Sequence, residues 1–432
     1  MMVPSFRLLL LALAAALPAA ALIGYAPALV APGVAVLLLC AVLAAADAML
    51  VVKRAKRIDA HTFGIFQLTK DLAATLPITI DNRSERELRL RLALPMPWGL
   101  SSGKLVEEIL APPGVSRLDW PCMPGERGDH RLEELHLETD SPLGLWALRL
   151  RRSLGAIVRV YPNLRDRATA ALFRRTADPG FRRRPRLGKG REFDNLRHYM
   201  SGDNYEDIDW KATARRGMPV VKLYQMEHAQ EVYAILDASR LSARPGIADS
   251  YVGAALHLAL VAQRQGDRFG LATFSNRTRC FLRARSGLSH FRLCRETIYN
   301  LHAERVSPDF SEVFTTLQLS LRRRALLIFF TSLDDPLLAE TFEREIALLS
   351  SRHLVLVNVP ETAEMRPLFE QNPPPTVDAL YGGLAAQMLR NRMHEVQLAL
   401  HNRGVKLALV DPARLSQRVT AQYLDVKRRQ GL

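Results

Sequence analysis

The sequence predicts an α/β domain with an open, mostly parallel sheet and helices on both faces, preceded by a two-helix membrane hairpin and a small β-sandwich. Three observations support this fold class. Two long apolar runs stand near the N-terminus, short alternating segments with turn residues follow, and strand-like and helical patterns alternate from residue 231 onward. Helices that connect neighbouring strands make those strands parallel and cover both faces of their sheet.

Residues 1–57 are predicted to form a membrane anchor with two transmembrane helices. Residues 8–23 carry no charge and residues 34–52 only that of Asp47, and each run approaches the ~20 residues that cross a bilayer. A signal peptide would explain the first run but not the second. Asp47 lies close to the end of the second run, so we expect its carboxylate to be solvated at the membrane interface.

The charges around the two runs predict their orientation. The connection between the runs is uncharged, whereas Lys53-Arg54-Ala55-Lys56-Arg57 follows the second run directly. Basic residues stay on the cytoplasmic side of a membrane. We therefore expect a multi-pass protein of the cell membrane, anchored in the lipid bilayer, with both ends of the hairpin and all soluble domains in the cytoplasm.

Residues 58–163 are predicted to form a small antiparallel β-sandwich. Residues 74–80 and 88–92 alternate apolar and polar side chains, and Asp81-Asn82-Arg83-Ser84 between them is typical of a turn. Further strands are expected at 115–120, 130–138 and 146–150. Nothing in this part indicates catalytic chemistry, so we expect a spacer or a binding module.

Residues 164–230 begin with an arginine-rich linker. The whole chain has 59 Lys and Arg against 44 Asp and Glu, a formal net charge of +15. Such a charge indicates an acidic partner, which could be nucleic acid, anionic lipid or an acidic protein surface. The alternative, for a membrane protein, is the ordinary excess of basic residues on the cytoplasmic side. Nucleic acid is not expected, because the phenylalanines of the linker are too sparse for base stacking.

Residues 231–432 are predicted to form the α/β domain. Residues 232–236 and 325–330 are uninterrupted apolar strands, as expected where both faces of a sheet are covered. The other predicted strands are 268–274, 278–283, 354–359 and 405–410, and the predicted helices are 250–264, 287–301, 310–321, 336–350, 381–402 and 415–427. Ligands of such sheets bind at the carboxyl ends of the strands, which directs attention to Asp237 and to residues 331–335.

A distinctive motif precedes the α/β domain. It reads Leu196-Arg197-His198-Tyr199-Met200-Ser201-Gly202-Asp203 and continues Asp207-Ile208-Asp209-Trp210-Lys211-Ala212-Thr213-Ala214-Arg215. This stretch resembles the signature of the bacterial family called domain of unknown function 58, which is roughly R-x-Y-x-x-G-D-x-x-x-x-I-D-W-x-x-[ST]-A-R. The matching residues are Arg197, Tyr199, Gly202, Asp203, Asp207, Asp209, Trp210, Lys211, Ala214 and Arg215.

The resemblance extends to the layout of nearly the whole chain. Members of that family typically combine a two-helix membrane anchor, a β-rich segment, this motif and a von Willebrand factor A-like domain. The resemblance therefore implies a bacterial inner-membrane protein that acts as an adaptor or scaffold and not as an enzyme. It also implies that the adaptor works with a MoxR-type AAA+ ATPase in chaperone-like assembly or envelope maintenance. No small-molecule substrate is expected.

Two interpretations of the motif stay open. As an internal brace, the carboxylates of Asp207 and Asp209 would pair with basic residues of the motif, and Trp210 would fill the seam between the β-rich and α/β parts. As a docking surface, the same residues would face a partner. The brace is the favoured interpretation. Paired carboxylates also occur in hydrolases, but no His, Ser or Cys with a supporting base accompanies them, so catalysis is not expected.

A metal site is the second feature that the resemblance brings into question. Von Willebrand factor A-like domains often hold a divalent cation through D-x-S-x-S after the first strand, together with a threonine and an aspartate from two other loops. This chain has Asp237-Ala238-Ser239-Arg240-Leu241, in which Leu241 offers no side-chain oxygen. Pro308 and Ser332 stand where the threonine and the aspartate are expected.

We therefore predict a degenerate site in which only Asp237 and Ser239 survive, and no bound cofactor. Mg²⁺ needs near-octahedral oxygen ligation, which two such residues do not supply. The alternative is a metal-dependent adhesion module that grips an acidic residue of its partner, with Asp334 or Asp335 supplying the missing carboxylate. The four cysteines contain no CxxC pair and indicate neither zinc nor a disulfide framework.

Overall fold

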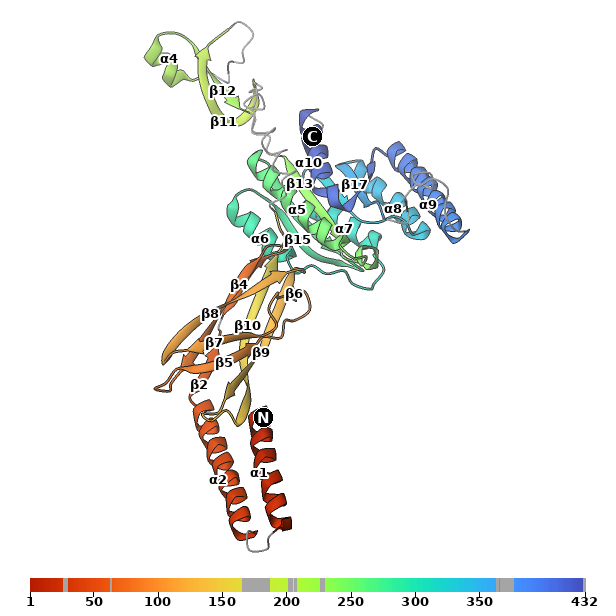
Figure 1. The fold of residues 1–432 in the computed structure, drawn as a ribbon. Coiled ribbons are helices and arrows are strands. Elements are labelled where there is room, and N and C mark those ends of the chain that lie inside the picture. Colours follow the sequence, from red (N-terminus) through yellow and green to blue (C-terminus); the bar gives the residue numbers. More distant parts are fainter. Residues whose placement is uncertain are drawn as a thin grey trace. The chain divides into compact units, whose positions relative to one another are not determined.

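The computed structural model describes the chain except residues 26–29, 63, 165–186, 201–204, 206–207, 226–229, 363–364, 366–376 and 430–432. The chain divides into two compact units, Met1–Asn163 and Leu164–Leu432. The first unit holds a helical hairpin and antiparallel sheets, and the second holds the α/β sheet and the signature motif (Figure 1).

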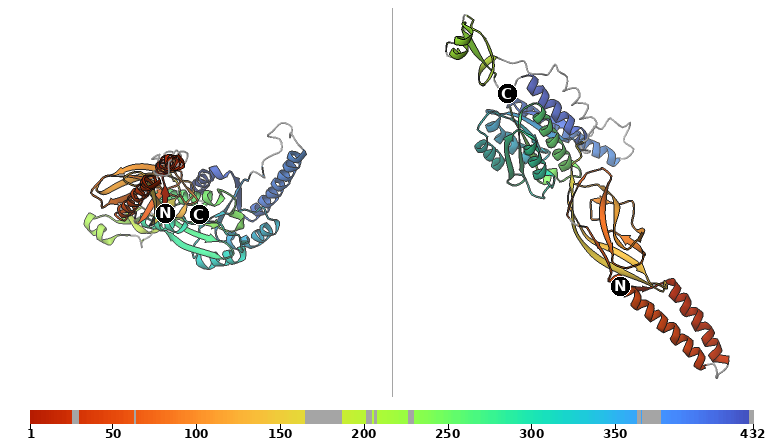
Figure 2. Two further views of the ribbon diagram at one scale, coloured as in Figure 1. Left: turned by 60° about the horizontal axis from the view of Figure 1, so that its bottom comes forward. Right: turned by 90° about the vertical axis from the view of Figure 1, so that its left-hand side faces the viewer.

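The helical hairpin begins with a strand that the sequence does not predict. β1 (Met2–Pro4) precedes α1 (Phe6–Tyr25), and α2 (Val30–Ala55) lies beside α1 (Figure 2). Among the described residues, one helix is long and apolar enough to cross a membrane, Ala31–Ala55 with a mean hydropathy of 2.6, whereas Phe6–Ala20 is a shorter apolar helix. Two helices are thus found where the sequence predicts them, and the crossing of a membrane by both stays a prediction.

The environment of the Asp47 side chain differs from the predicted one. Its side chain is only 1% exposed. One carboxylate oxygen accepts a hydrogen bond from the hydroxyl of Ser141, and the other accepts one from the backbone N–H of Leu143 at 3.0 Å. The expectation of a solvated carboxylate is therefore wrong, because a turn of the β-rich part, distant in sequence, supplies the hydrogen-bond donors that water would otherwise provide.

Two sheets form the β-rich part of the first unit. One has the order β2-β4-β8-β6, and the other has the order β1-β10-β9-β5-β7 with β3 parallel to β10. Alternate side chains of both sheets form one core around Trp120. The strands are β2 (Ile58–His61), β3 (Ile65–Thr69), β4 (Ala74–Asn82), β5 (Leu88–Ala93), β6 (Leu100–Ser101), β7 (Glu107–Ala111), β8 (Gly114–Pro124), β9 (Gly128–Asp140) and β10 (Trp146–Tyr161).

The second unit contains a six-stranded sheet of order β15-β14-β13-β16-β17-β18. Only β15 is antiparallel to its neighbour, so the predicted mostly parallel sheet is confirmed. Its strands are β13 (Glu231–Asp237), β14 (Arg268–Phe274), β15 (Thr278–Arg285), β16 (Leu326–Phe330), β17 (Leu354–Pro360) and β18 (Lys406–Val410).

Helices cover both faces of this sheet, because successive apolar residues of each strand point to opposite sides. Val232 packs in a core with α5 (Ile247–Arg264), α6 (Leu288–Ile298) and α10 (Leu415–Arg428). The next residue, Tyr233, packs in the opposite core. That core includes the helices α7 (Phe310–Ser320), α8 (Pro336–Ser350) and α9 (Val377–Asn402).

A small module lies within residues 164–230, which are predicted to hold the arginine-rich linker and the signature motif. β11 (Leu187–His198) pairs antiparallel with β12 (Val220–Gln225), and α4 (Trp210–Arg216) lies between them in sequence. We call β11, α4 and β12 the signature module. Apolar residues are few in β11 and do not alternate, which is why the sequence does not predict a strand there.

Candidate functional site

The signature motif builds the local structure of its module. Asp209 is the N-cap of α4, and its Oδ1 accepts hydrogen bonds from the N–H groups of Lys211 at 3.0 Å and Ala212 at 3.1 Å. The hydroxyl of Thr213 accepts a hydrogen bond from the N–H of Val220 at 3.1 Å, and the N–H of Asp209 donates to the Val220 carbonyl at 2.9 Å. These bonds attach α4 to β12.

Four large side chains in and beside the signature module face solvent. Trp210 is 68% exposed, and Met200, Tyr205 and Met218 are 66%, 74% and 55% exposed. The second unit therefore does not cover Trp210, and its place in a seam with the β-rich part stays a prediction. The physical reason for the exposure is that α4 has seven residues, none of them buried, so it brings no second layer that could cover an indole.

The remaining motif residues have different places. Lys211, Ala214 and Arg215 are exposed on α4. Arg197 is part of β11 and donates a 3.2 Å hydrogen bond to the carbonyl of His198. The ring of Tyr199 lies 5.8 Å from that of Tyr205. Three predicted motif residues, Gly202, Asp203 and Asp207, lie outside the described residues.

Asp237 lies at the carboxyl end of β13, as the topology predicts. It is 1% exposed, and its two carboxylate oxygens accept hydrogen bonds from the N–H of Ser239 at 2.7 Å and the hydroxyl of Thr331 at 2.6 Å. Burial raises the pKa of the Asp237 carboxyl, and the bonds from Ser239 and Thr331 oppose that rise. The Ser239 hydroxyl accepts a 3.3 Å hydrogen bond from the N–H of Leu241 and so caps a short turn.

Two carboxylates could complete a metal site here, but each forms an ion pair with an arginine. Arg244 pairs with Asp334 at 2.6 Å, and Arg240 pairs with Asp335 at 2.6 Å. Within the described ranges, no group of three or more His, Cys, Asp or Glu could hold a metal ion. The donor set therefore does not fit Mg²⁺, because cationic guanidinium groups stand where a divalent cation would need anionic oxygens.

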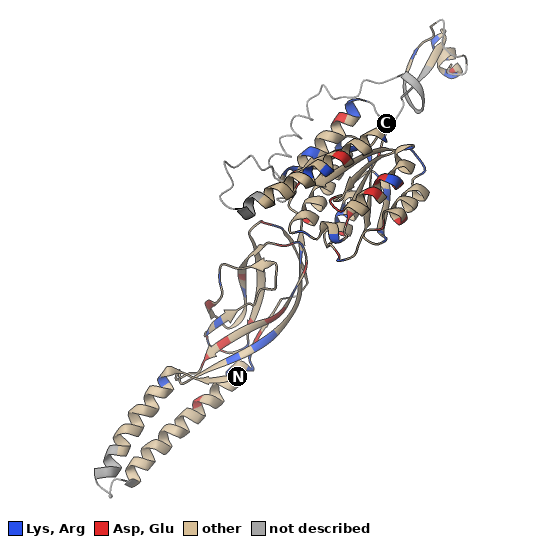
Figure 3. Ribbon diagram, turned by 90° about the vertical axis from the view of Figure 1, so that its right-hand side faces the viewer, with Lys and Arg blue, Asp and Glu red and all other residues tan. Residues whose placement is uncertain are grey.

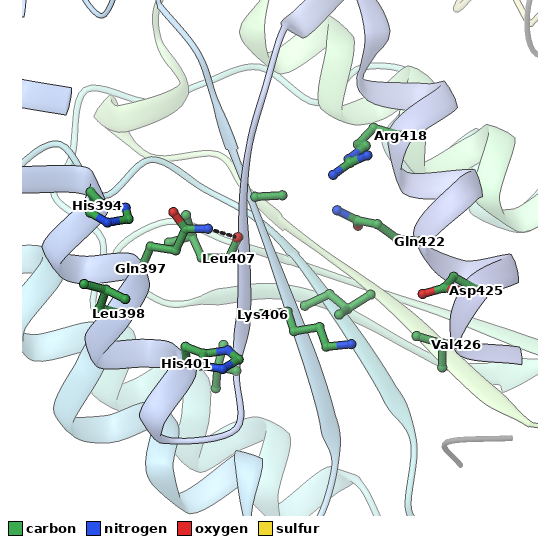
Figure 4. Close-up of a pocket in the computed structure, with 13 residues that line it drawn as sticks. His394, Gln397, Leu398, His401, Lys406, Leu407, Arg418, Gln422, Asp425 and Val426 are labelled. Atoms are coloured by element: carbon green, nitrogen blue, oxygen red, sulfur yellow. Dashed lines mark hydrogen bonds between the residues drawn. The ribbon is translucent and has the colours of Figure 1, made fainter. Parts of the chain in front are cut away.

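A further pocket lies beside the outermost strand of the sheet and was not predicted from the sequence. It measures about 410 Å³, between α9, β18 and α10 (Figure 4). Its charged and titratable lining consists of His394, His401, Lys406, Arg418 and Asp425. The Gln397 side chain donates a 3.3 Å hydrogen bond to the Leu407 carbonyl at its wall. The pocket thus combines a sheet edge with a lining that carries more basic than acidic groups.

Comparisons with known proteins concern the second unit most directly. Residues 195–367 match the model of a family described as "Protein of unknown function DUF58". None of the curated proteins compared with the chain matches it. The match includes the signature motif from Asn195 onward, five of the sheet strands and the loops around Asp237.

Several solved structures are similar to the chain. The SpRpn10 VWA domain is 12% identical with a TM-score of 0.27, over 45% of this chain and 95% of that one. The conserved hypothetical protein BatB from Bacteroides thetaiotaomicron is 14% identical with a TM-score of 0.29, over 46% and 99%. An aerotolerance-related membrane protein from Bacteroides fragilis gives 14% and 0.28, over 46% and 99%. At such scores no function is carried over. The match of residues 195–367 to the DUF58 model contains the signature motif and confirms the resemblance for this part of the chain.

Proposed function

We propose that this chain is a membrane-anchored adaptor that binds another protein through its signature module. The observation that carries the proposal is the 68% exposure of Trp210 within a motif whose other residues build the module around it. An indole in contact with water is costly to maintain, and Trp and Tyr are the side chains that most often dominate protein interfaces. The proposal therefore adopts the docking interpretation of the motif instead of the brace.

The charge of the module indicates the chemistry of its partner. Lys211, Arg215 and Arg216 are exposed on α4, and the Asp209 carboxylate of the same segment caps that helix. Together with the net charge of +15, this favours an acidic protein surface. The family resemblance suggests that the partner is a MoxR-type AAA+ ATPase, and that the pair serves chaperone-like assembly or envelope maintenance at the bacterial inner membrane, with the soluble domains in the cytoplasm.

Binding without catalysis is part of this proposal. The Asp237 carboxylate is buried and accepts two hydrogen bonds within the fold. The thiol of Cys294 is buried as well, and burial raises its pKa to about 12, which leaves almost no nucleophilic thiolate at neutral pH. The alternative of a metal-dependent adhesion module at Asp237 and Ser239 is disfavoured by the guanidinium groups of Arg240 and Arg244.

A binding experiment with matched tryptophan variants tests the proposal. The full chain in nanodiscs is immobilised, and binding of the MoxR-type ATPase of the same organism is measured with ATP present. Trp210→Ala should weaken binding at least about tenfold, as loss of an interface tryptophan does. Trp98→Ala is the control, because Trp98 is 86% exposed on the β-rich part. Equal binding by wild type and Trp210→Ala would contradict the proposed docking surface.

A further inference from the structure

The turn between β9 and β10 contacts both helices of the hairpin. We call residues 141–145 the tip loop. We propose that the tip loop lies in the interfacial layer of the lipid bilayer, and that the hydrocarbon core ends at the level of Asp47 instead of at the basic cluster 53–57. This inference rests on the membrane anchor of the proposed function and specifies which surface of the β-rich part the membrane contacts.

The tip loop is fastened to α2 by hydrogen bonds. Asp47 accepts one from the Ser141 hydroxyl and another from the Leu143 N–H at 3.0 Å. At the base of the loop, the indole N–H of Trp146 donates to the carbonyl of Ala44 at 2.9 Å. The loop is therefore held beside the stretch of α2 that contains Ala44 and Asp47.

The same loop meets α1 at the beginning of that helix. The N–H of Ser5 donates to the Leu145 carbonyl at 2.9 Å. Gly144 has a φ of 71°, and a Cβ added there would lie 2.9 Å from a guanidinium nitrogen of Arg7. The start of α1 and the Ala44–Asp47 stretch of α2 therefore lie at one level, which is the level of the tip loop.

Helix lengths agree with a membrane boundary at this level. The candidate span Ala31–Ala55 has 25 residues, which corresponds to about 37 Å and exceeds the ~30 Å hydrocarbon core. Counting only residues 31–47 gives about 25 Å, and the whole of α1 gives about 30 Å. Beyond Asp47, the face of α2 that carries Val51 and Ala55 is buried against Leu148 of β10, whereas Met49 and Leu50 are exposed. One face of this end of α2 is therefore covered by protein instead of lipid.

The chemistry of the loop suits the interfacial layer. No residue of the tip loop is charged, and Leu143 is 55% exposed at its turn. Trp146 follows it, and indoles are enriched where hydrocarbon meets headgroups. Arg7 can extend toward lipid phosphates while its helix stays in the membrane. The charged residues of the hairpin lie at its end next to the strands, and the rest of both described helices is uncharged (Figure 3).

Spin labels measure the depth of the loop directly. The full chain, with Cys40, Cys122, Cys280 and Cys294 replaced by alanine and its fold checked by circular dichroism, is reconstituted in nanodiscs. Single cysteines are introduced as Leu143→Cys, Met123→Cys and Val42→Cys and labelled with a nitroxide. Accessibility to oxygen, which concentrates in lipid, is compared with accessibility to a water-soluble nickel chelate by power saturation.

We expect the Leu143 label to be severalfold more accessible to oxygen than to the nickel chelate, as is the Val42 label on the free part of α2. The Met123 label should show the reverse. Gly114, at the other end of β8, pairs with Asn82, which also pairs with Ile58 just after α2, so Met123 stands about 30 Å along the strand from the hairpin. If Val42 reports lipid but Leu143 reports water, the inference is wrong while the anchor stands. If both report water, the membrane anchor itself is wrong.

Variants of Asp47 provide a second test with the same spin labels. Asp47→Ala removes the acceptor of both hydrogen bonds and should shift the Leu143 label toward the nickel chelate, without moving the Val42 label. Asp47→Asn keeps one acceptor oxygen and should give an intermediate shift. An unchanged Leu143 label in Asp47→Ala would show that the polar contact does not hold the loop at the membrane.

Discussion

Thr331 donates a 2.6 Å hydrogen bond to Asp237 across the ends of two neighbouring parallel strands, β16 and β13. Both side chains are almost fully buried, with 0% and 1% exposure. The bond therefore compensates a carboxylate that has lost most of its contact with water. It also joins the two loops from which a divalent cation would take its ligands, so Asp237 contributes to the fold.

The first prediction concerns this bond. Thr331→Val keeps the shape of the side chain but leaves one carboxylate oxygen of Asp237 without its donor. We expect a loss of about 1–3 kcal/mol in the free energy of unfolding, measured by urea denaturation of the solubilised chain. Thr341→Val is the control, because Thr341 bonds only a carbonyl of its own helix and should cost less than about 0.5 kcal/mol. Equal effects of the two variants would contradict the assignment.

The second prediction concerns pH. Burial raises the pKa of Asp237 above its ordinary value of 3.8. A carboxyl group with a raised pKa in the folded state favours the protonated form. Its contribution to stability is therefore complete below pH 3.8 and is lost as the pH rises through the folded-state pKa. Asp237→Asn removes this loss, so the stability of the variant relative to wild type should increase between pH 4 and pH 7. A relative stability that falls over this range would show that the ionised carboxylate is favoured in the fold.

The third prediction concerns Mg²⁺. Stabilisation by a ligand requires a free concentration above Kd, and one buried carboxylate flanked by two arginine pairs gives little affinity for a divalent cation. Millimolar Mg²⁺ should leave the Tm of the wild-type chain unchanged. The variant with Arg240→Ala and Arg244→Ala frees Asp334 and Asp335, so any gain in Tm should occur only there. A rise in the wild type that Asp237→Ala removes would favour the adhesion module.

The fourth prediction compares two tryptophans. Trp210 is 68% exposed, whereas Trp120 is fully buried in the core of the β-rich part. Trp210→Ala should therefore change the free energy of unfolding by less than about 1 kcal/mol. Trp120→Ala should cost about 3–5 kcal/mol. Thermal melts of both variants measure the difference, and a large destabilisation by Trp210→Ala would restore the brace interpretation of the motif.

Local patterns predict the parts of this fold that depend on burial. The uninterrupted apolar run 325–330 predicts a strand that is covered on both faces. The alternation of residues 74–80 predicts a strand that is covered on one face, and both strands are found. Partners that lie far apart in sequence leave no such pattern. Asp47 and Ser141 are separated by 94 positions, so the sequence shows an ionisable residue near a helix end but not its hydrogen-bond partner. The exposure of Trp210 depends on the absence of a covering layer, which its own motif does not reveal.

The last prediction concerns a buried carboxylate that joins α10 to the sheet. Asp267 is 1% exposed at the start of β14 and accepts hydrogen bonds from the hydroxyl of Tyr423 and from Nζ of Lys427, the latter at 2.7 Å. Burial and the neighbouring Asp267 raise the pKa of the Tyr423 hydroxyl, which therefore stays protonated and continues to donate. Two donors from one helix thus converge on a single carboxylate.

Asp267→Ala removes the carboxylate that accepts hydrogen bonds from the ammonium of Lys427 and the hydroxyl of Tyr423, so both donors lose this acceptor. Removing one partner of a buried ion pair costs about 3–5 kcal/mol, so we expect a loss of that order in urea denaturation. Asp425→Ala removes a carboxylate whose largely exposed pair with Arg429 lies at the C-terminal end of the same helix, and it should cost less than about 1 kcal/mol. A loss in Asp267→Ala no larger than in Asp425→Ala would show that α10 is held by its apolar face alone, through residues such as Val419 and Leu415.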